Sequence, residues 1–115
     1  MAAKFGIKYA DGFLITASTT IAYTVPTSLD RSVISAGRVV NYGTTLEDFT
    51  IHIVPKGGSV VDQYIAIDAK PIAVGETILL SEIIGEALSE GATIQVKAST
   101  TVKLSLTVEG TDFTA

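Results

Sequence analysis

His52 is the residue that could take part in the most kinds of catalysis or metal binding, and it is the only histidine among the 115 residues. A catalytic triad, a zinc site or an imidazole general base would have to use it, since the chain also lacks cysteine. His52 lies in residues 49–53, where apolar and polar residues alternate, on the same side as Thr50. A metal site needs several convergent ligands. We therefore predict that His52 is an exposed strand residue, and we expect no metal or other cofactor.

Carboxylates are the other candidates for chemistry. They occur in three groups, Glu47-Asp48, then Asp62 and Asp68, and then Glu82, Glu86 and Glu90 at a spacing of four. None of them matches a calcium-binding loop, and like charges spaced by four repel each other on a helix, which favours a solvated face. The loop Gly57-Gly58-Ser59 lacks the lysine of a phosphate-binding loop and is predicted to be a turn. No catalytic residue is predicted, and an enzyme is the least favoured class.

Charge and composition restrict the partners. The formal net charge is −4 and no window clusters Lys or Arg, so nucleic-acid binding is not expected. No segment approaches the roughly 20 apolar residues of a membrane span, and no apolar leader is recognised, so we expect no membrane association and a cytosolic origin. Charged residues make up 17% of the chain, against about 25% typically, and mean hydropathy is +0.45. This surplus indicates that a partner covers part of the surface.

Period-two alternation predicts most of the structure. It is clearest in residues 101–109, where Val102, Leu104, Leu106 and Val108 share one face, and it recurs in residues 94–98. The short Ser99-Thr100 link predicts that these two segments form an antiparallel hairpin. Further strands are predicted at 20–25, 32–41 with a bulge at Gly37, 49–53, 64–67 and 77–80, and turns at 55–58 and 72–76. Only 81–87, with Ser81 as a possible cap, is a candidate helix.

These elements predict a single domain over residues 1–115, an all-β antiparallel sandwich of seven or eight strands. Residues 1–19 leave two alternatives open. Residues 4–9 and 13–15 flank Asp11-Gly12, which favours a first hairpin, because Asp-Gly between apolar residues is a strong turn signal. The alternative is an arm that adds its strand or its aromatic side chains to a neighbouring subunit.

A series of short motifs resembles the small β-sandwich virion proteins of tailed bacteriophages. The motifs are Y-T-V-P at 23–26, N-Y-G at 41–43, I-V-P-K-G-G at 53–58, G-E-T at 75–77 and G-A-T-I-Q-V-K-A-S at 91–99. The resemblance covers residues 20–110 and consists mainly of turn residues and strand alternation. It implies a jelly-roll-like sandwich of the capsid decoration, or cement, type. It carries over no catalytic residue.

The resemblance also implies a set of partners. The expected partner is the major capsid protein at the capsid surface of a virion made in a bacterial cytoplasm, and the chain is expected to form a homo-oligomer, a trimer in preference to a dimer. Its departure from the family is the segment 1–19, whose candidate interface residues are Phe5, Ile7, Tyr9 and Phe13. The alternative function is a tail or tail-fibre component that binds a host receptor or glycan through loops such as residues 57–62.

Overall fold

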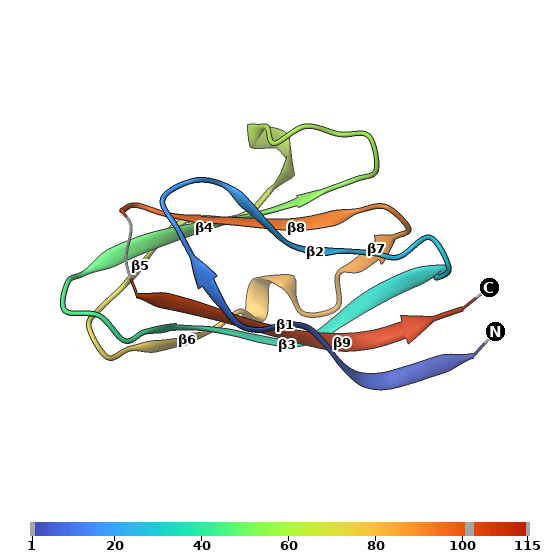
Figure 1. The fold of residues 1–115 in the computed structure, drawn as a ribbon, viewed down its shortest axis with the longest axis horizontal. Coiled ribbons are helices and arrows are strands. Elements are labelled where there is room, and N and C mark those ends of the chain that lie inside the picture. The colour runs from blue at the N-terminus through green and yellow to red at the C-terminus, as the bar shows by residue number, and fades with distance from the viewer. Residues whose placement is uncertain (1, 101–102, 115) are drawn as a thin grey trace.

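Two antiparallel β-sheets pack against each other in the computed structural model, which describes residues 2–100 and 103–114 (Figure 1). Sheet A has the order β1-β9-β3-β6, with β7 also paired to β3, and sheet B has the order β2-β8-β4-β5. The elements are β1 (Ala3–Ile15), β2 (Thr20–Thr24), β3 (Arg31–Asn41), β4 (Glu47–Val54), the 3-10 helix η1 (Asp62–Tyr64), β5 (Ile65–Ile72), β6 (Thr77–Leu79), the 3-10 helix η2 (Ser81–Ile83), β7 (Ala87–Ser89), β8 (Thr93–Ala98) and β9 (Leu104–Phe113). The predicted all-β sandwich is confirmed, with nine strands in the described residues.

The strand order is that of a jelly roll. β1 pairs with β9, β2 with β8, β3 with β6 and β7, and β4 with β5, all antiparallel. Such nested pairs arise when one long hairpin folds over and its strands divide between two sheets, which is the jelly-roll arrangement. One consequence is that loops 16–19, 42–46 and 73–76 gather at the same end of the molecule as residues 99–100 and Lys103.

The inner faces of β8 and β9 supply much of the core. Their buried alternate residues are Ile94, Val96, Ala98, Leu104, Leu106 and Val108, as predicted, whereas Val102 lies outside the described residues. The predicted hairpin between these strands is wrong, because β8 pairs with β2 and β4, while β9 pairs with β1 and β3. Alternation identifies the side chains that share a face, but it does not identify the strand that pairs with them.

The N-terminal segment is one strand, which differs from the predicted hairpin. β1 pairs along its length with β9, from Ala3 opposite Phe113 to Ile15 opposite Leu104, with three register shifts. Gly12 adopts the positive φ that an Asp-Gly turn would use, +66°, but the chain continues forward as a bulged strand. The turn signal therefore marks an irregularity in the strand and does not reverse the chain.

The predicted exposure of His52 is wrong. The predicted faces of β4 are correct, since Ile51 lies opposite core residue Val96 and His52 lies opposite Gln95 on the outer side. However, His52 is only 8% exposed, and outward-facing Val54 is 2% exposed. Figure 1 shows the reason, because the β4–β5 connection with η1 rises above β4 and β8 on the outer side of sheet B. This connection covers His52 and Val54, while its own residues 55–63 stay exposed.

Two local predictions on sheet A also differ from the structure. The candidate helix at 81–87 forms only η2, and its N-cap is Leu80, so Ser81 does not cap it. The irregularity in β3 lies between Ile34 and Ala36, not at Gly37. Gly37 instead allows close packing, because a Cβ placed there would lie 3.2 Å from the Cδ1 atom of buried Leu80.

The turns that flank β5 are confirmed. The N–H of Gly58 donates to the carbonyl of Pro55 at 2.9 Å, and the N–H of Glu76 donates to the carbonyl of Ala73 at 3.0 Å. β5 itself begins at Ile65 and continues through Pro71, beyond its predicted limits. Proline is tolerated because β5 is an edge strand of sheet B.

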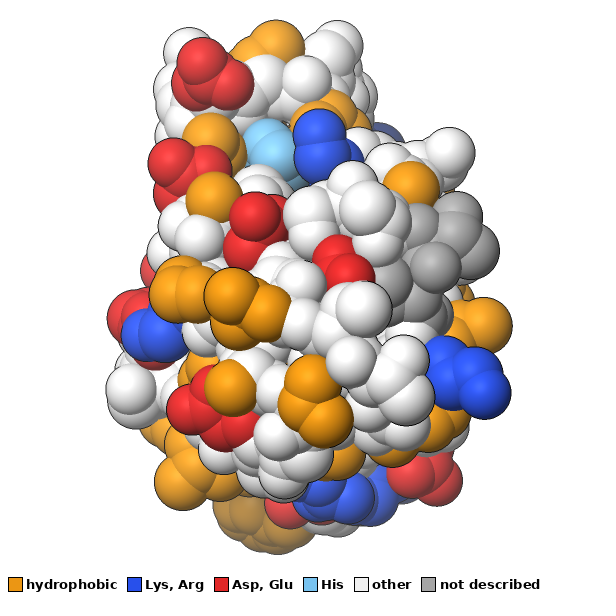
Figure 2. All heavy atoms as spheres, turned by 90° about the vertical axis from the view of Figure 1, so that its left-hand side faces the viewer, with side chains coloured by type: hydrophobic (Ala, Val, Ile, Leu, Met, Phe, Trp, Pro, Cys, Tyr) orange, Lys and Arg blue, Asp and Glu red, His pale blue; other side chains and the backbone are white. Residues whose placement is uncertain are grey.

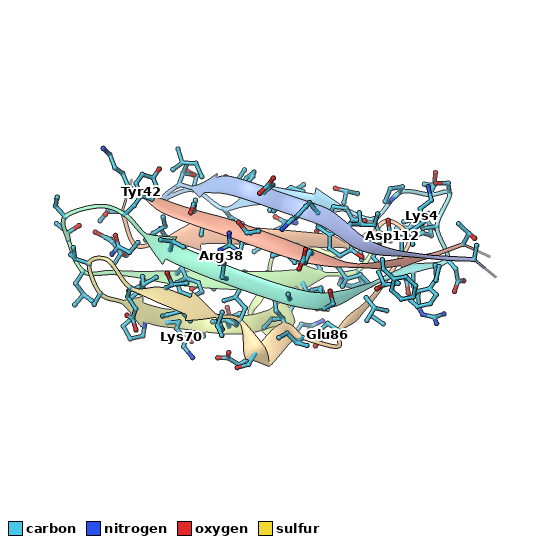
Figure 3. All side chains as sticks on the ribbon, turned by 90° about the horizontal axis from the view of Figure 1, so that it is seen from below. Lys4, Arg38, Tyr42, Lys70, Glu86 and Asp112 are labelled. Atoms are coloured by element: carbon cyan, nitrogen blue, oxygen red, sulfur yellow. The ribbon has the colours of Figure 1, made fainter. Side chains whose placement is uncertain are left out.

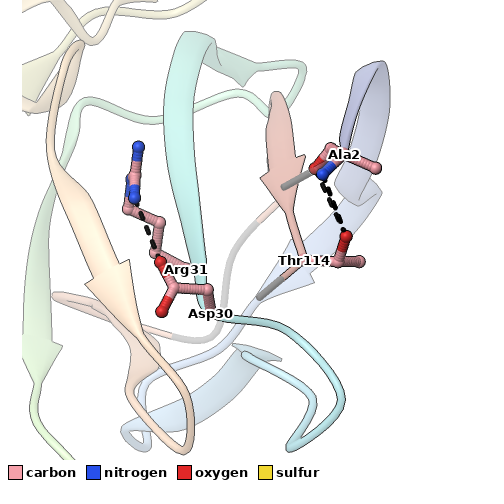
Figure 4. Close-up of polar contacts among 4 residues, drawn as sticks. All are labelled: Ala2, Asp30, Arg31 and Thr114. Atoms are coloured by element: carbon pink, nitrogen blue, oxygen red, sulfur yellow. Dashed lines mark hydrogen bonds and ion pairs between the residues drawn. The ribbon is translucent and has the colours of Figure 1, made fainter.

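The two ends of the described chain meet at the end of the sandwich opposite the gathered loops (Figure 1). The N–H of Ala2 donates to Oγ1 of Thr114 at 3.2 Å, and the N–H of Thr114 donates to the carbonyl of Ala2 at 2.9 Å (Figure 4). On the next strand, Arg31 pairs with Asp30 at 3.0 Å. No helix in the described ranges is long and apolar enough to cross a membrane.

Candidate functional site

One end of the sandwich exposes three large apolar side chains. Tyr42 and Leu46 lie in the β3–β4 loop and Val74 lies in the β5–β6 loop, and they are 55%, 67% and 54% exposed. Figure 2 faces this end and shows apolar side chains exposed across it. Loop tips usually carry small or polar residues, so large apolar side chains there indicate a surface that another molecule covers. We call Tyr42, Leu46 and Val74 the apolar tip.

Asn41 holds the two loops of the apolar tip in place. Its side chain, 1% exposed, donates from Nδ2 to the carbonyls of Thr45 at 2.9 Å and Ile72 at 3.2 Å. Its Oδ1 accepts from the N–H of Gly43 at 3.0 Å, and its backbone N–H donates to the carbonyl of Glu76 at 3.0 Å. The loops are thereby fixed before a partner arrives, which lowers the entropy lost on binding.

Glu47 also stabilises this end of the molecule. Its carboxylate accepts hydrogen bonds from Ser99 at 2.5 Å and Thr100 at 2.9 Å on Oε1, and from Thr45 at 2.6 Å on Oε2. The hydroxyls of Ser99 and Thr45, with a smaller contribution from Thr100, hold the pKa of this carboxyl below its usual range. The β3–β4 loop is therefore joined to Ser99 and Thr100, which follow β8, through one ionised side chain.

A groove lies at the opposite end, beside the 57–62 segment that the sequence offered for receptor binding. It has a volume of about 420 Å³ and is lined by Ile53, Pro55, Lys56, Ala87, Leu88, Ser89, Glu90 and Ala92. Lys56 pairs with Glu90 at 2.8 Å, and the second oxygen of Glu90 is buried with no hydrogen-bond partner among the described residues. This groove is mainly apolar, with one ion pair at its wall.

An aromatic and hydroxyl cluster joins the two sheets near the chain ends. The rings of Tyr9 on β1 and Tyr23 on β2 stack at 4.3 Å. Asp112 accepts from Tyr9 and from Ser32, each at 2.8 Å, and Ser32 also bonds to Tyr23 at 3.0 Å. Burial, and then the hydrogen bond to Asp112, raise the pKa of Tyr9 far above its ordinary value. Ser32 is fully buried, so its hydroxyl is closed to a substrate, and the cluster links β1, β2 and β3 across the two sheets.

The candidate interface residues of the N-terminal segment do not form one surface. Phe5 is 79% exposed, whereas Tyr9 is 6% exposed, and Ile7 and Phe13 are half-buried against the core. Only Phe5 is therefore free to make a large contact with another molecule. Across the described part of the chain, no three His, Asp or Glu side chains converge as metal ligands would.

Sequence reasoning did not identify the apolar tip or its supports. Asn41-Tyr42-Gly43 was recognised as a turn motif, and this turn chemistry was the available signal for Asn41. Two of the three hydroxyl partners of Glu47, Ser99 and Thr100, are 52 and 53 residues away in the chain. No local pattern could have predicted that contact.

Comparisons of the chain with protein-family models, with curated protein sequences and with solved structures found no match.

Proposed function

We propose that this chain is a structural protein of a phage virion, a homo-oligomeric capsid decoration protein whose apolar tip binds the major capsid protein. The observation that carries the proposal is the exposure of Tyr42, Leu46 and Val74 on loops that are already fixed by hydrogen bonds. Fixed loops with an exposed tyrosine suit protein–protein contact, since aromatic anchors dominate the energy of such interfaces. Jelly rolls occur in viral capsid proteins, and this fold-level analogy supports the proposal without carrying it.

The apolar tip also suits weak binding repeated many times. Three side chains on short loops make a small contact, and a small contact gains strength when an oligomer presents several copies to a repeating lattice. A decoration protein works in this way, because each subunit of the oligomer engages a different capsid subunit. The sandwich itself supplies the rigid spacing between these contacts.

The test is binding to expanded, empty capsids assembled from the major capsid protein of the same genome. The double variant Tyr42→Ser with Leu46→Ser is expected to co-sediment at least about tenfold more weakly than the unaltered chain, because two anchors of the contact are lost. The matched control is Val60→Ser with Val61→Ser, which alters two exposed apolar residues in the β4–β5 connection and should bind normally. Equal loss in both variants, or no binding by the unaltered chain, would contradict the proposal.

The groove at the other end favours a second candidate, a tail or tail-fibre component that binds a host glycan. Its volume of about 420 Å³ is in the range of small-ligand sites, and lectin domains also use jelly rolls. A glycan would find a carboxylate at Glu90 and an ammonium at Lys56. Retention of the chain on host cells or a glycan array, lost in Glu90→Gln, would favour this candidate over capsid decoration.

A further inference from the structure

The outer face of sheet A is open (Figure 3). A row of side chains crosses it where Arg38 on β3 lies opposite Thr107 on β9 and opposite Leu79 on β6. At the edges of this face, Leu14 is 51% exposed and Leu79 is 70% exposed. Antiparallel sheets often leave one face in water, but exposed leucines at both edges make this face a candidate for association.

Lys8, Glu109 and Arg38 lie on this face, and among the described residues Arg38 has no counter-ion. Lys8 pairs with Glu109 at 3.2 Å. Arg38 forms no ion pair with any residue in the described ranges, and Figure 3 shows it at the middle of the face. A hollow of about 90 Å³ is lined by Arg38, Leu79, Lys8 and Glu109 among others. The face thus carries a free cation, a carboxylate and a hollow close together.

We propose that a second copy of this chain binds to the outer face of sheet A, face to face, about a two-fold axis. In such an interface residue i contacts j and j contacts i. The protruding side chain of Leu79 is the knob. Gly12 on β1 has no side chain, and a Cβ placed there would meet no atom within 4 Å, so this position leaves open space for the knob.

The strand order makes this contact reciprocal. An axis that lies in the interface midway between β3 and β9 places β3 over the partner's β9, and β6 over the partner's β1. Arg38 then lies over the partner's Thr107, with the partner's Glu109 two residues, about 7 Å, along the strand and within reach of the guanidinium. Because Gly12 donates to Thr107 at 3.2 Å, Leu79 lies over the partner's Gly12 in the same row.

The area of the face suits a small dimer interface. Three strands of about 10 residues and a fourth column made by the three-residue strands β6 and β7 cover roughly 570 Å² in projection, below the ~800 Å² per partner of a standard interface. The corrugation of the side chains adds to the projected value. The result is a closed dimer with four layers of sheet, since a two-fold contact leaves no free binding face.

This inference names the interface through which the chain would self-associate, and it holds whether or not the apolar tip binds a capsid. The test measures mass by sedimentation equilibrium and light scattering on the full chain alone, so a trimer would leave the capsid proposal standing, and capsid binding by the apolar tip is measured separately. The unaltered chain is expected to have twice the 12.0 kDa mass of one chain. A monomer at the highest concentration tested, or a trimer, would overturn the two-fold interface.

Variants on this face locate the contact. Leu79→Lys should raise the dimer dissociation constant by at least about tenfold, because the knob is replaced by a charge. Leu46→Lys is the matched control, since Leu46 is similarly exposed at 67% but lies on the apolar tip, and its mass should be unchanged. Equal dissociation of both variants, or of neither, would overturn the proposal. Unchanged melting temperatures of the dilute proteins show that the variants are folded.

A charge exchange tests the predicted pair directly. Arg38→Glu should weaken the dimer by at least about tenfold, and the added change Glu109→Arg should restore most of the lost affinity by reversing both charges. Restoration is a result that a merely structural role of Arg38 would not produce. No recovery in the double variant would overturn the Arg38–Glu109 contact.

Discussion

The outer faces of the two sheets meet their surroundings differently. On sheet B the chain covers part of its own face, and the β4–β5 connection buries His52 and Val54 outside the main core. On sheet A, no described segment covers Arg38 or Leu79. A jelly roll has two outer sheet faces. In this protein the β4–β5 connection lies over the outer face of sheet B only. The uncovered face is the one to which we propose that a second copy binds.

The most damaging change is expected within sheet A itself. A Cβ atom at Gly110 would lie 2.1 Å from the carbonyl oxygen of Val33 and 2.6 Å from Cε2 of Tyr9, so neighbouring strands would have to separate. Gly110→Ala should lower the free energy of unfolding by more than about 3 kcal/mol, as measured by denaturant titration. Gly43→Ala is the control, with its nearest Cβ neighbour at 3.4 Å, and a comparable loss there would contradict this explanation.

The comparison of the two faces is tested by matched valines. Val54→Ala on the covered face of sheet B should lower the free energy of unfolding by about 1–2.5 kcal/mol, because it opens a cavity under the β4–β5 connection. Val40→Ala on the uncovered face should cost less than about 0.5 kcal/mol in dilute protein, where no second copy is bound. Thermal or urea unfolding measures both. Similar costs for the two variants would show that the faces do not differ in this way.

Low pH should destabilise the end of sheet B where Glu47 bonds to Thr45, Ser99 and Thr100. Because the folded state lowers the pKa of Glu47, its contribution to stability is complete above the pKa of the unfolded chain and is lost as pH falls through the folded value. Glu47→Gln should therefore flatten the fall of melting temperature between about pH 6 and 3. Glu82, whose pKa is lowered by Lys70, provides the comparison, and a larger effect of Glu82→Gln would argue against this role for Glu47.

The smallest effect is expected for the ion pair on the uncovered face. Lys8 and Glu109 are 3.2 Å apart, with 46% and 35% of their side chains exposed, so solvent screens their attraction. Lys8→Ala should change the free energy of unfolding of dilute protein by less than about 0.5 kcal/mol. A loss above 1 kcal/mol in denaturant titration would mean that this face is less accessible to water than its exposure indicates.

The sequence was most informative where one face of a strand is buried. Alternation identified the buried residues of β8 and β9, from Ile94 to Val108, because period two follows directly from strand geometry. It could not identify pairing partners, so two strands in different sheets were predicted to form one hairpin. Pairing depends on how the long hairpin folds over, which is a property of the whole chain.

The burial of a residue by segments distant from it in the sequence also could not be predicted. His52 has the sequence context of an exposed strand residue, and its burial depends on a connection that folds back over sheet B. Glu47 gave no local sign that Ser99 and Thr100 would enclose its carboxylate. The candidate site was the part least predictable from the sequence, because the apolar tip exists only where separate loops meet at one end of the fold.

The pairing of Ala2 with Thr114 has a mechanical consequence. Both ends of the described chain leave the molecule at the same point, on antiparallel neighbours β1 and β9. A force that pulls the two ends apart would load the hydrogen bonds between these strands one pair at a time, from Ala3 and Phe113 inward, as in opening a zipper. The domain would therefore yield at low tension when pulled by its ends, while a load applied along the sandwich would strain the ladders in parallel.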